Sequence, residues 1–130
     1  MDIDQCVCSG VALDRFLRPS VLAALKDGKS HGYDIVRTLA GLSMFRDAPP
    51  DASGVYKALR VMEKEGLLTS ALESASGGPA KRCYALTPQG RACLRQWRGT
   101  LRTYREQIDR LLTMLTAPAG TRKKKTAKRT

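Results

Sequence analysis

An amphipathic helix that leads directly into an apolar strand is the feature that most constrains how this chain can fold. Residues 53–68 read SGVYKALRVMEKEGLL, and Val55, Leu59 and Met62 recur at helical spacing within them. Apolar side chains at these intervals lie on one face of a helix, so that face can be buried. Gly66 then interrupts the pattern, which predicts that the helix ends there.

Two short strands joined by a turn are predicted immediately after this helix. We expect the first strand over about residues 67–74 and the second over about residues 82–86, with ASGGPA at 75–80 between them. Clusters of Gly, Pro and Ser typically join the two strands of a hairpin. A helix followed at once by a hairpin is the arrangement of a winged helix-turn-helix. The expected fold is therefore mainly α, with a small β-hairpin.

The outward face of the same helix carries positive charges and an aromatic ring. Such a face suits DNA, because cations neutralise phosphates while polar or planar side chains reach base edges. A hydroxyl at the start of the helix lies near backbone amides that can receive a phosphate. The candidate DNA-binding residues of the helix and the wing are Ser53, Tyr56, Lys57, Arg60, Lys81 and Arg82. The alternative is that they are ordinary solvated charges of a surface helix.

The whole chain is strongly basic. It has 130 residues and a formal net charge of +11, from 23 Lys and Arg against 12 Asp and Glu. Six of these cations lie in residues 122–129, and 17 against 12 remain without them. The balance favours nucleic acid as partner, with an anionic membrane surface as the alternative for the last residues alone.

No targeting signal or membrane span is evident in the sequence. No apolar run reaches the length of a membrane span, and the start MDID is acidic where a secretory signal is basic. We therefore expect a cytoplasmic protein.

Two further helices are expected earlier in the chain, over about residues 14–26 and 31–40. Their apolar residues recur at helical spacing, which predicts one buried face for each. The expected inward residues are Leu17, Val21, Leu22 and Leu25 in the first helix, and Tyr33, Ile35, Val36 and Leu39 in the second. Residue types that cap helices predict a cap at Ser30, a left-handed C-terminal cap at Gly41, and a cap of the third helix at Asp51 or Ser53.

A last helix carries an apolar seam with the spacing of a coiled coil. Thr87 and Pro88 are suited to open it, as capping hydroxyl and first helical residue. The seam follows at alternating steps of three and four residues: Leu94, Trp97, Leu101, Tyr104, Ile108, Leu111 and Leu115. Each large apolar side chain contributes roughly 1.5–3 kcal/mol when fully buried, so a partner helix is expected and we predict a homodimer through this seam. The alternative is that the seam packs on its own domain.

Four motifs resemble those of PadR-like transcriptional regulators. SHGYDIV at 30–36 is similar to that family's HGYEI motif. GVYKAL at 54–59 and MEKEGL at 62–67 resemble its TVYRAL and LEEEGL. GGPAKRCYALT at 77–87 resembles its wing motif GGPARRYYRLT, and the dipeptide at 90–91 continues the match. The motifs occur in the family's order over most of the chain.

The resemblance implies a dimeric DNA-binding transcription factor, usually a repressor. In that family the winged helix holds the operator and the C-terminal helix mediates dimerisation. The resemblance implies that Tyr56 and Lys57 read the DNA sequence, and that Lys81 and Arg82 contact DNA from the wing, the loop-and-strand hairpin that follows the helix. The single long C-terminal helix resembles the short subgroup, without an added effector domain. Gly54 stands where the family often has Thr, so no hydroxyl is available at that position.

The cysteines and the single histidine leave several interpretations open. Cys6 and Cys8 could share a soft metal, but two thiols do not complete a tetrahedral site. A second pair in a dimer, or Cys83 or Cys93, could complete it; the alternative is four reduced thiols. For His31 we expect a packing role rather than metal ligation. No motif of a catalytic nucleophile or a phosphate-binding loop occurs, so an enzyme is not expected.

The expected organisation has four parts. They are an N-terminal arm with the Cys-x-Cys pair at 1–12, a winged helix-turn-helix at 13–88, a dimerisation helix at 89–116 and a disordered basic tail at 117–130. The predicted function is sequence-specific regulation of transcription, with repression as the expected sign and release by a small molecule, a metal or a redox signal. A small hydrophobic or planar effector could lie between subunits at Trp97 and Tyr104; the alternative is that these two residues are simply core of the interface. The rivals are a general nucleic-acid-binding architectural protein and a winged-helix adaptor that holds a protein partner.

Overall fold

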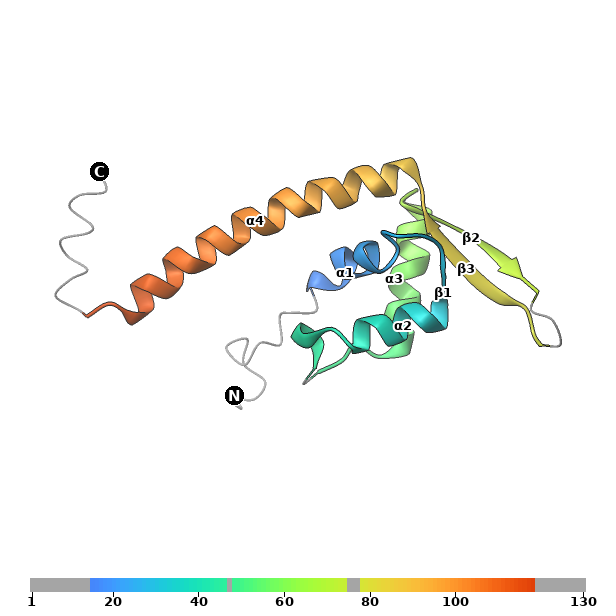
Figure 1. Ribbon diagram of the computed structural model, residues 1–130, viewed down its shortest axis with the longest axis horizontal. Coiled ribbons are helices and arrows are strands. Elements are labelled where there is room, and N and C mark those ends of the chain that lie inside the picture. The colour runs from blue at the N-terminus through green and yellow to red at the C-terminus, as the bar shows by residue number, and fades with distance from the viewer. Residues whose placement is uncertain (1–14, 47, 75–77, 119–130) are drawn as a thin grey trace. The chain divides into compact units, whose positions relative to one another are not determined.

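The computed structural model describes residues 15–46, 48–74 and 78–118. The elements are α1 (Leu17–Ala24), β1 (Ser30–His31), α2 (Gly32–Ala40), the short 3-10 helix η4 (Ser43–Phe45), α3 (Ala52–Lys64), β2 (Leu68–Glu73), β3 (Lys81–Leu86) and α4 (Pro88–Thr116) (Figure 1). The chain divides after Arg95 into two compact units, and the first turns of α4 belong to the first unit. The predicted N-terminal arm and nearly all of the predicted basic tail lie outside the described residues.

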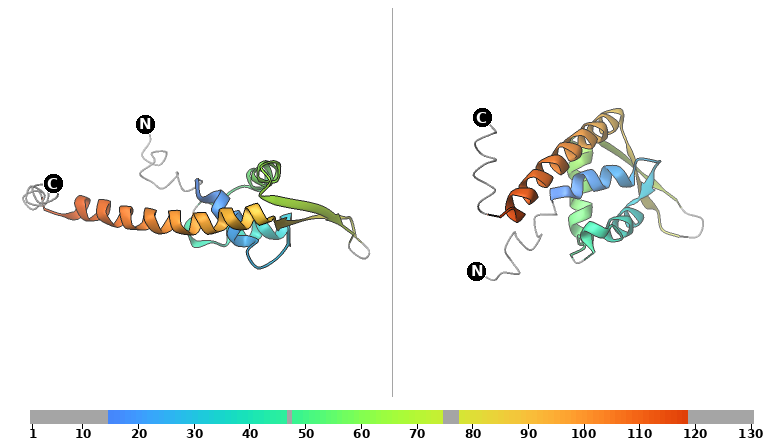
Figure 2. Two further views of the ribbon diagram at one scale, coloured as in Figure 1. Left: turned by 90° about the horizontal axis from the view of Figure 1, so that it is seen from above. Right: turned by 60° about the vertical axis from the view of Figure 1, so that its left-hand side comes forward.

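The first unit is built around one apolar core between α1, α2 and α3. Figure 2 shows these three helices from two further directions, with the hairpin of β2 and β3 extending beyond them. The core side chains, each at most 1% exposed, are Val21, Leu22, Leu25, Ile35, Leu39, Val55, Leu59 and Met62. The predicted buried faces of the first and third helices are confirmed, with Leu17 half-buried at the start of α1. The first helix is shorter than expected and begins at Leu17.

The sheet has three antiparallel strands in the order β1–β3–β2. The predicted hairpin is confirmed: β2 and β3 pair from Leu68 with Leu86 to Glu73 with Lys81. The third strand, β1, was not predicted. It pairs Ser30 with Tyr84 and His31 with Cys83. A strand of two residues carries no alternation that a sequence pattern could reveal.

Three expectations for the second helix are wrong. Ser30 does not cap α2, because its backbone belongs to β1 and the N-cap is His31, without a side-chain cap bond. Gly41 has φ −85°, in the right-handed region, so it forms no left-handed cap. Tyr33 is 63% exposed rather than inward, because it precedes the buried Ile35 by two residues, about 200° around a helix.

Both ends of α3 are capped as the sequence predicts. The Asp51 carboxylate accepts a hydrogen bond from the Gly54 amide at 3.0 Å. At the other end Gly66 has φ +83°, and the Leu67 amide donates to the Met62 carbonyl at 3.0 Å. A left-handed glycine with this bond is the Schellman termination, which closes the helix and turns the chain into β2.

The start of α4 is fixed against the end of α3 at Gly90. The Thr87 hydroxyl accepts from the Gly90 amide at 3.0 Å, which confirms the predicted cap, and donates to the Gly66 carbonyl at 2.6 Å. Gly90 is buried, and a Cβ atom there would lie 2.1 Å from the Leu67 carbonyl oxygen. No side chain fits, because the obstructing atom belongs to the backbone. Gly90 therefore allows α4 to approach the link between α3 and β2.

Gly90→Ala is expected to lower the free energy of unfolding by about 1–3 kcal/mol, the cost of overpacking a tight site. The matched control is Gly99→Ala in the same helix, where a Cβ atom would meet nothing within 4 Å. The control should raise stability by roughly 0.5–1 kcal/mol, because alanine is the better helix former. Chemical denaturation followed by circular dichroism compares the two. Equal effects of the two variants would contradict the packing assigned to Gly90.

Candidate nucleic-acid interface

The outward face of α3 presents the cations that the sequence singled out. Lys57 and Arg60 are both exposed, and Tyr56 beside them is half-buried. Within the described ranges neither Lys57 nor Arg60 forms a salt bridge. Exposed cations without an acidic partner are available to neutralise phosphates. This helix face therefore has the charge that DNA binding requires.

The first turn of α3 is less open to a phosphate than its sequence suggests. The Ser53 hydroxyl donates to the Asp51 carboxylate at 3.2 Å, and the same carboxylate accepts from the Gly54 amide. The Val55 amide donates to the Asp51 carbonyl at 3.1 Å. A phosphate at this position would meet a carboxylate and only the two remaining amides of the turn. A Cβ atom on Gly54 would lie 2.6 Å from the Asp51 carboxylate, so glycine leaves room for this cap.

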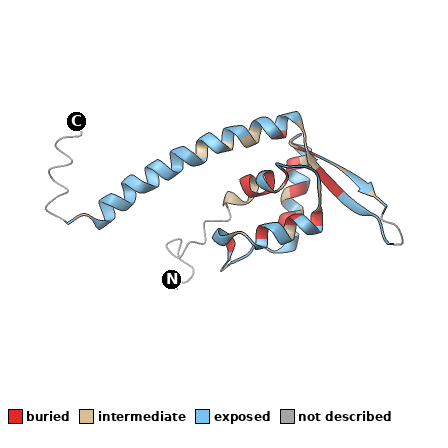
Figure 3. Cartoon of the chain, in the orientation of Figure 1, coloured by how far each residue is buried: buried red, intermediate tan, exposed pale blue. Residues whose placement is uncertain are grey.

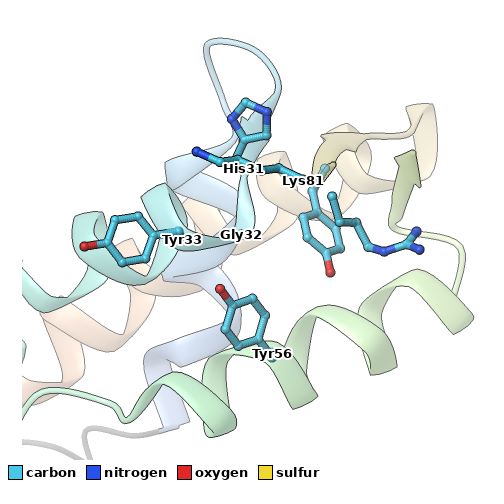
Figure 4. A pocket seen from close by; sticks show the side chains of 7 residues that line it. His31, Gly32, Tyr33, Tyr56 and Lys81 are labelled. Carbon is cyan, nitrogen blue, oxygen red and sulfur yellow. The ribbon is translucent and has the colours of Figure 1, made fainter. Parts of the chain in front are cut away.

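The Tyr56 ring is positioned by the glycine that begins α2. A Cβ atom on Gly32 would lie 2.6 Å from Cε1 of Tyr56. In Figure 4 Tyr56 extends from α3 toward Gly32, with Tyr33 to one side. The absence of a side chain at Gly32 thus lets the ring pack against the start of α2. The histidine-glycine-tyrosine motif has a structural role here, as it brings two helices close together.

A pocket of about 250 Å³ lies between α3 and the wing, the hairpin formed by β2 and β3. It brings together three of the candidate DNA-binding residues with four that lay outside that prediction. The lining residues are His31, Gly32, Tyr33, Tyr56, Lys81, Arg82 and Tyr84. Burial raises the pKa of the Tyr84 phenol, so it stays protonated and can donate a hydrogen bond at neutral pH. Tyr84 was missed because its neighbours in space come from distant parts of the sequence.

A chain of hydrogen bonds connects the wing to α3. Arg82 in β3 donates through Nη1 to the Ser70 hydroxyl at 3.0 Å. Ser70 in β2 donates in turn to Glu63 of α3 at 2.8 Å. The position of Arg82 is therefore fixed by a contact that also orients the wing relative to α3. Both Arg82 and the neighbouring Lys81 are exposed. The sequence offered no signal for this network, because it depends on the strand register.

The His31 side chain lies among charged partners. Its Nε2 is 3.3 Å from the Glu73 carboxylate, which also accepts from Lys29 Nζ at 2.8 Å. This hydrogen bond lowers the pKa of Glu73 and raises that of Lys29, so both stay charged at neutral pH. Cys83 is buried beside them, and burial raises the pKa of its thiol. Cys6 and Cys8, the predicted metal pair, lie outside the described residues.

The seam of α4 is exposed along most of its length (Figure 3). Leu94 and Trp97 are half-buried, whereas Leu101, Tyr104, Ile108, Leu111 and Leu115 are exposed, Leu115 to 75%. Two apolar residues outside the predicted seam, Leu112 and Met114, are each 56% exposed. They flank the seam and widen the apolar face toward the end of the helix. Sequence reasoning missed them because it counted only the two core positions of each heptad.

Among the helices in the described ranges, none combines the length and the apolar character that a membrane span requires.

Three helices around one core, a basic third helix and a two-stranded wing define a winged helix-turn-helix protein. The family model for the PadR-like family of transcriptional regulators matches residues 21–96, which include all of the first unit's core and the wing. The chain therefore belongs to the PadR-like family. The resemblance seen in the four sequence motifs is confirmed.

Solved structures with this fold come from several bacteria. A PadR family regulator from Eggerthella lenta has a TM-score of 0.67 at 26% identity, covering 82% of this chain and 92% of that one. A PadR family regulator from Clostridium difficile has a TM-score of 0.62 at 21% identity, with coverages of 75% and 98%. Bacillus subtilis PadR, solved in complex with operator DNA, has a TM-score of 0.57 at 26% identity, covering 64% of this chain and 46% of that one. A search of curated proteins found no significant match.

Proposed function

We propose that this protein regulates transcription by binding a specific DNA operator as a homodimer, with repression as the sign of regulation. The observation that carries the proposal is the α3 face, where Lys57 and Arg60 are exposed next to Tyr56 and form no salt bridge with any residue that the structure describes. The wing cations Lys81 and Arg82 line the same pocket as Tyr56. The similarity to Bacillus subtilis PadR, whose structure was solved with operator DNA, supports this proposal.

In this proposal α3 of each subunit enters the major groove, and the wing contacts the flanking backbone. Lys57 and Arg60 neutralise phosphates or reach base edges, and the Tyr56 ring, fixed against Gly32, offers a rigid polar tip. Two such helices in a symmetric dimer read two half-sites about one helical turn apart. The arrangement gives specificity, because base contacts and half-site spacing must be satisfied together.

The homodimer part of the proposal is supported by the exposed apolar face of α4. Five seam residues and the two flanking ones would otherwise remain in water. Pairing with the same helix of a second chain buries them in an isologous interface. A signal that changes how the α4 helices pair changes the spacing of the reading helices and releases DNA. Trp97 and Tyr104 on this seam would contact a planar effector bound between the subunits.

Removal of residues 121–130 separates a specific regulator from a general binder that relies on its basic end. We expect the truncated chain to bind its own upstream region within about tenfold of the full chain, because base contacts come from α3. Binding to unrelated DNA should fall and become less sensitive to salt, because the truncation removes six cations from each chain and twelve from the dimer. The slope of log affinity against log salt should decrease by at most about 11. Gel shifts at several salt concentrations measure both. Equal loss on all fragments would favour the architectural rival.

A further inference from the structure

Three side chains of metal-binding types lie together where the wing meets the first strand. His31 comes from β1, Glu73 from β2 and Cys83 from β3, and one ligand atom of each lies within 4.8 Å of the others. The strand register produces this grouping. His31 and Cys83 are direct partners, and Glu73 follows the partner of Cys83, Ala71, by two residues. Paired residues and residues two apart share one face of a sheet, so the three side chains project to the same side.

The donor set is one imidazole nitrogen, one carboxylate oxygen and one thiol sulfur. These are the ligand types of zinc sites, with metal–ligand distances of about 2.0–2.3 Å, which place ligand atoms roughly 3.3–3.8 Å apart in a tetrahedron. The His31 and Glu73 ligand atoms are already 3.3 Å apart, and the other pairs, within 4.8 Å, must approach by at most about 1.5 Å. The His31 and Glu73 side chains are 35% and 38% exposed and can rotate, whereas Cys83 is buried and fixed. The site needs movement of side chains only.

The charges around the group are compatible with a cation. His31 has carboxylates on both sides, Glu73 at 3.3 Å from Nε2 and Asp34 at 3.9 Å from Nδ1. Lys29, which now bonds to Glu73, is 67% exposed and can move into water when an ion takes its place. Lys81 faces Glu73 across the hairpin and is also exposed. Neither ammonium group is held by burial, so neither blocks the site.

We propose that His31, Glu73 and Cys83 bind one divalent cation of the zinc type, with the fourth position open to water. Binding replaces the proton on the Cys83 sulfur, which leaves to solvent, by the metal ion. Because the ligands come from all three strands, the ion would fasten β1, β2 and β3 together. This site is distinct from the predicted metal pair at Cys6 and Cys8. The proposal is derived from the register of the three strands and does not depend on whether the protein binds DNA.

Titration of the full-length chain with Co²⁺, a spectroscopic substitute for Zn²⁺, tests this proposal. The background carries Cys6→Ser and Cys8→Ser, which removes the competing thiol pair. We expect binding of one ion per chain, with a thiolate-to-cobalt charge-transfer band in the near ultraviolet and displacement by Zn²⁺. No band in this background would overturn the proposal, whatever the protein does with DNA.

Three variants in the same background assign the ligands. Cys83→Ser should abolish the charge-transfer band, while Cys93→Ser, the matched control, should leave it unchanged. His31→Gln changes a partly exposed side chain outside the apolar core and keeps the test valid should Cys83→Ser fold poorly. It should weaken Co²⁺ binding by more than the roughly 10–100-fold that loss of an outer-shell partner costs. A band that survives Cys83→Ser, or an affinity unchanged by His31→Gln, would refute the assignment.

Discussion

The Ile108→Lys/Leu111→Lys variant is expected to sediment as a monomer at concentrations at which the parent chain is a dimer. Both side chains are more than half exposed in the single chain, on the part of α4 where the apolar face is widest. In a homodimer the variant loses four buried apolar side chains, each contributing roughly 1.5–3 kcal/mol, and places four ammonium groups in the interface. We expect the dimer dissociation constant to rise at least about a thousandfold.

The control for this experiment adds the same charge on the polar side of α4. Thr103→Lys/Thr113→Lys changes two exposed residues outside the seam and should leave the dimer intact. Sedimentation velocity of the three proteins over a range of concentrations gives the comparison. Specific DNA binding should be lost with the dimer, because a single reading helix contacts only one half-site. A variant that stays dimeric would place the interface elsewhere.

The second large effect is expected at the reading helix. Lys57→Ala/Arg60→Ala should weaken binding to the operator about a thousandfold. The estimate assumes roughly 1 kcal/mol for each of four contacts in a dimer, at the lower end for base or phosphate contacts. Both side chains are exposed and lie outside the core, so the free energy of unfolding should change little. Fluorescence anisotropy with labelled upstream DNA measures the affinity at one fixed salt concentration.

Arg95→Ala removes one exposed cation from α4 and serves as the control for charge alone. It should alter operator affinity by less than about threefold. Thermal unfolding of all variants verifies that the fold is intact. If the double α3 variant binds operator DNA as the parent does, the winged helix does not read DNA through this face, and the protein-adaptor rival gains support.

Most of the fold could be predicted from local patterns. The apolar spacing of Val55, Leu59 and Met62 predicted the buried face of α3, and Gly66 predicted its end. Thr87 correctly marked the start of α4 through its capping hydroxyl. These signals work because periodicity and capping depend on residues close together in the sequence.

Features that depend on pairing between distant segments could not be predicted. The strand β1 is defined by its partner β3, so nothing within its two residues indicates it. The bonds from Arg82 to Ser70 and from Ser70 to Glu63 require the hairpin register and the position of α3. His31 had no evident partner in the sequence, because Glu73 reaches it only through the sheet.

In the candidate interface, too, the local sequence predicted some features, whereas others depend on contacts that only the structure shows. Residue types and spacing selected Tyr56, Lys57 and Arg60, but not the way in which Gly32 fixes the Tyr56 ring. At Ser53 the sequence suggested an open helix terminus, whereas the Asp51 carboxylate occupies part of it. A cap and a phosphate site use the same amides, and only the side-chain geometry distinguishes them.

A nucleotide-resolution footprint of the purified protein on the DNA upstream of its own gene tests the central claim most directly. We predict two short protected segments, related by a two-fold axis and separated by about one helical turn of roughly 10 base pairs. Protection should persist after removal of residues 121–130. The absence of protection, or uniform coating of the whole fragment, would contradict specific binding by a pair of winged helices.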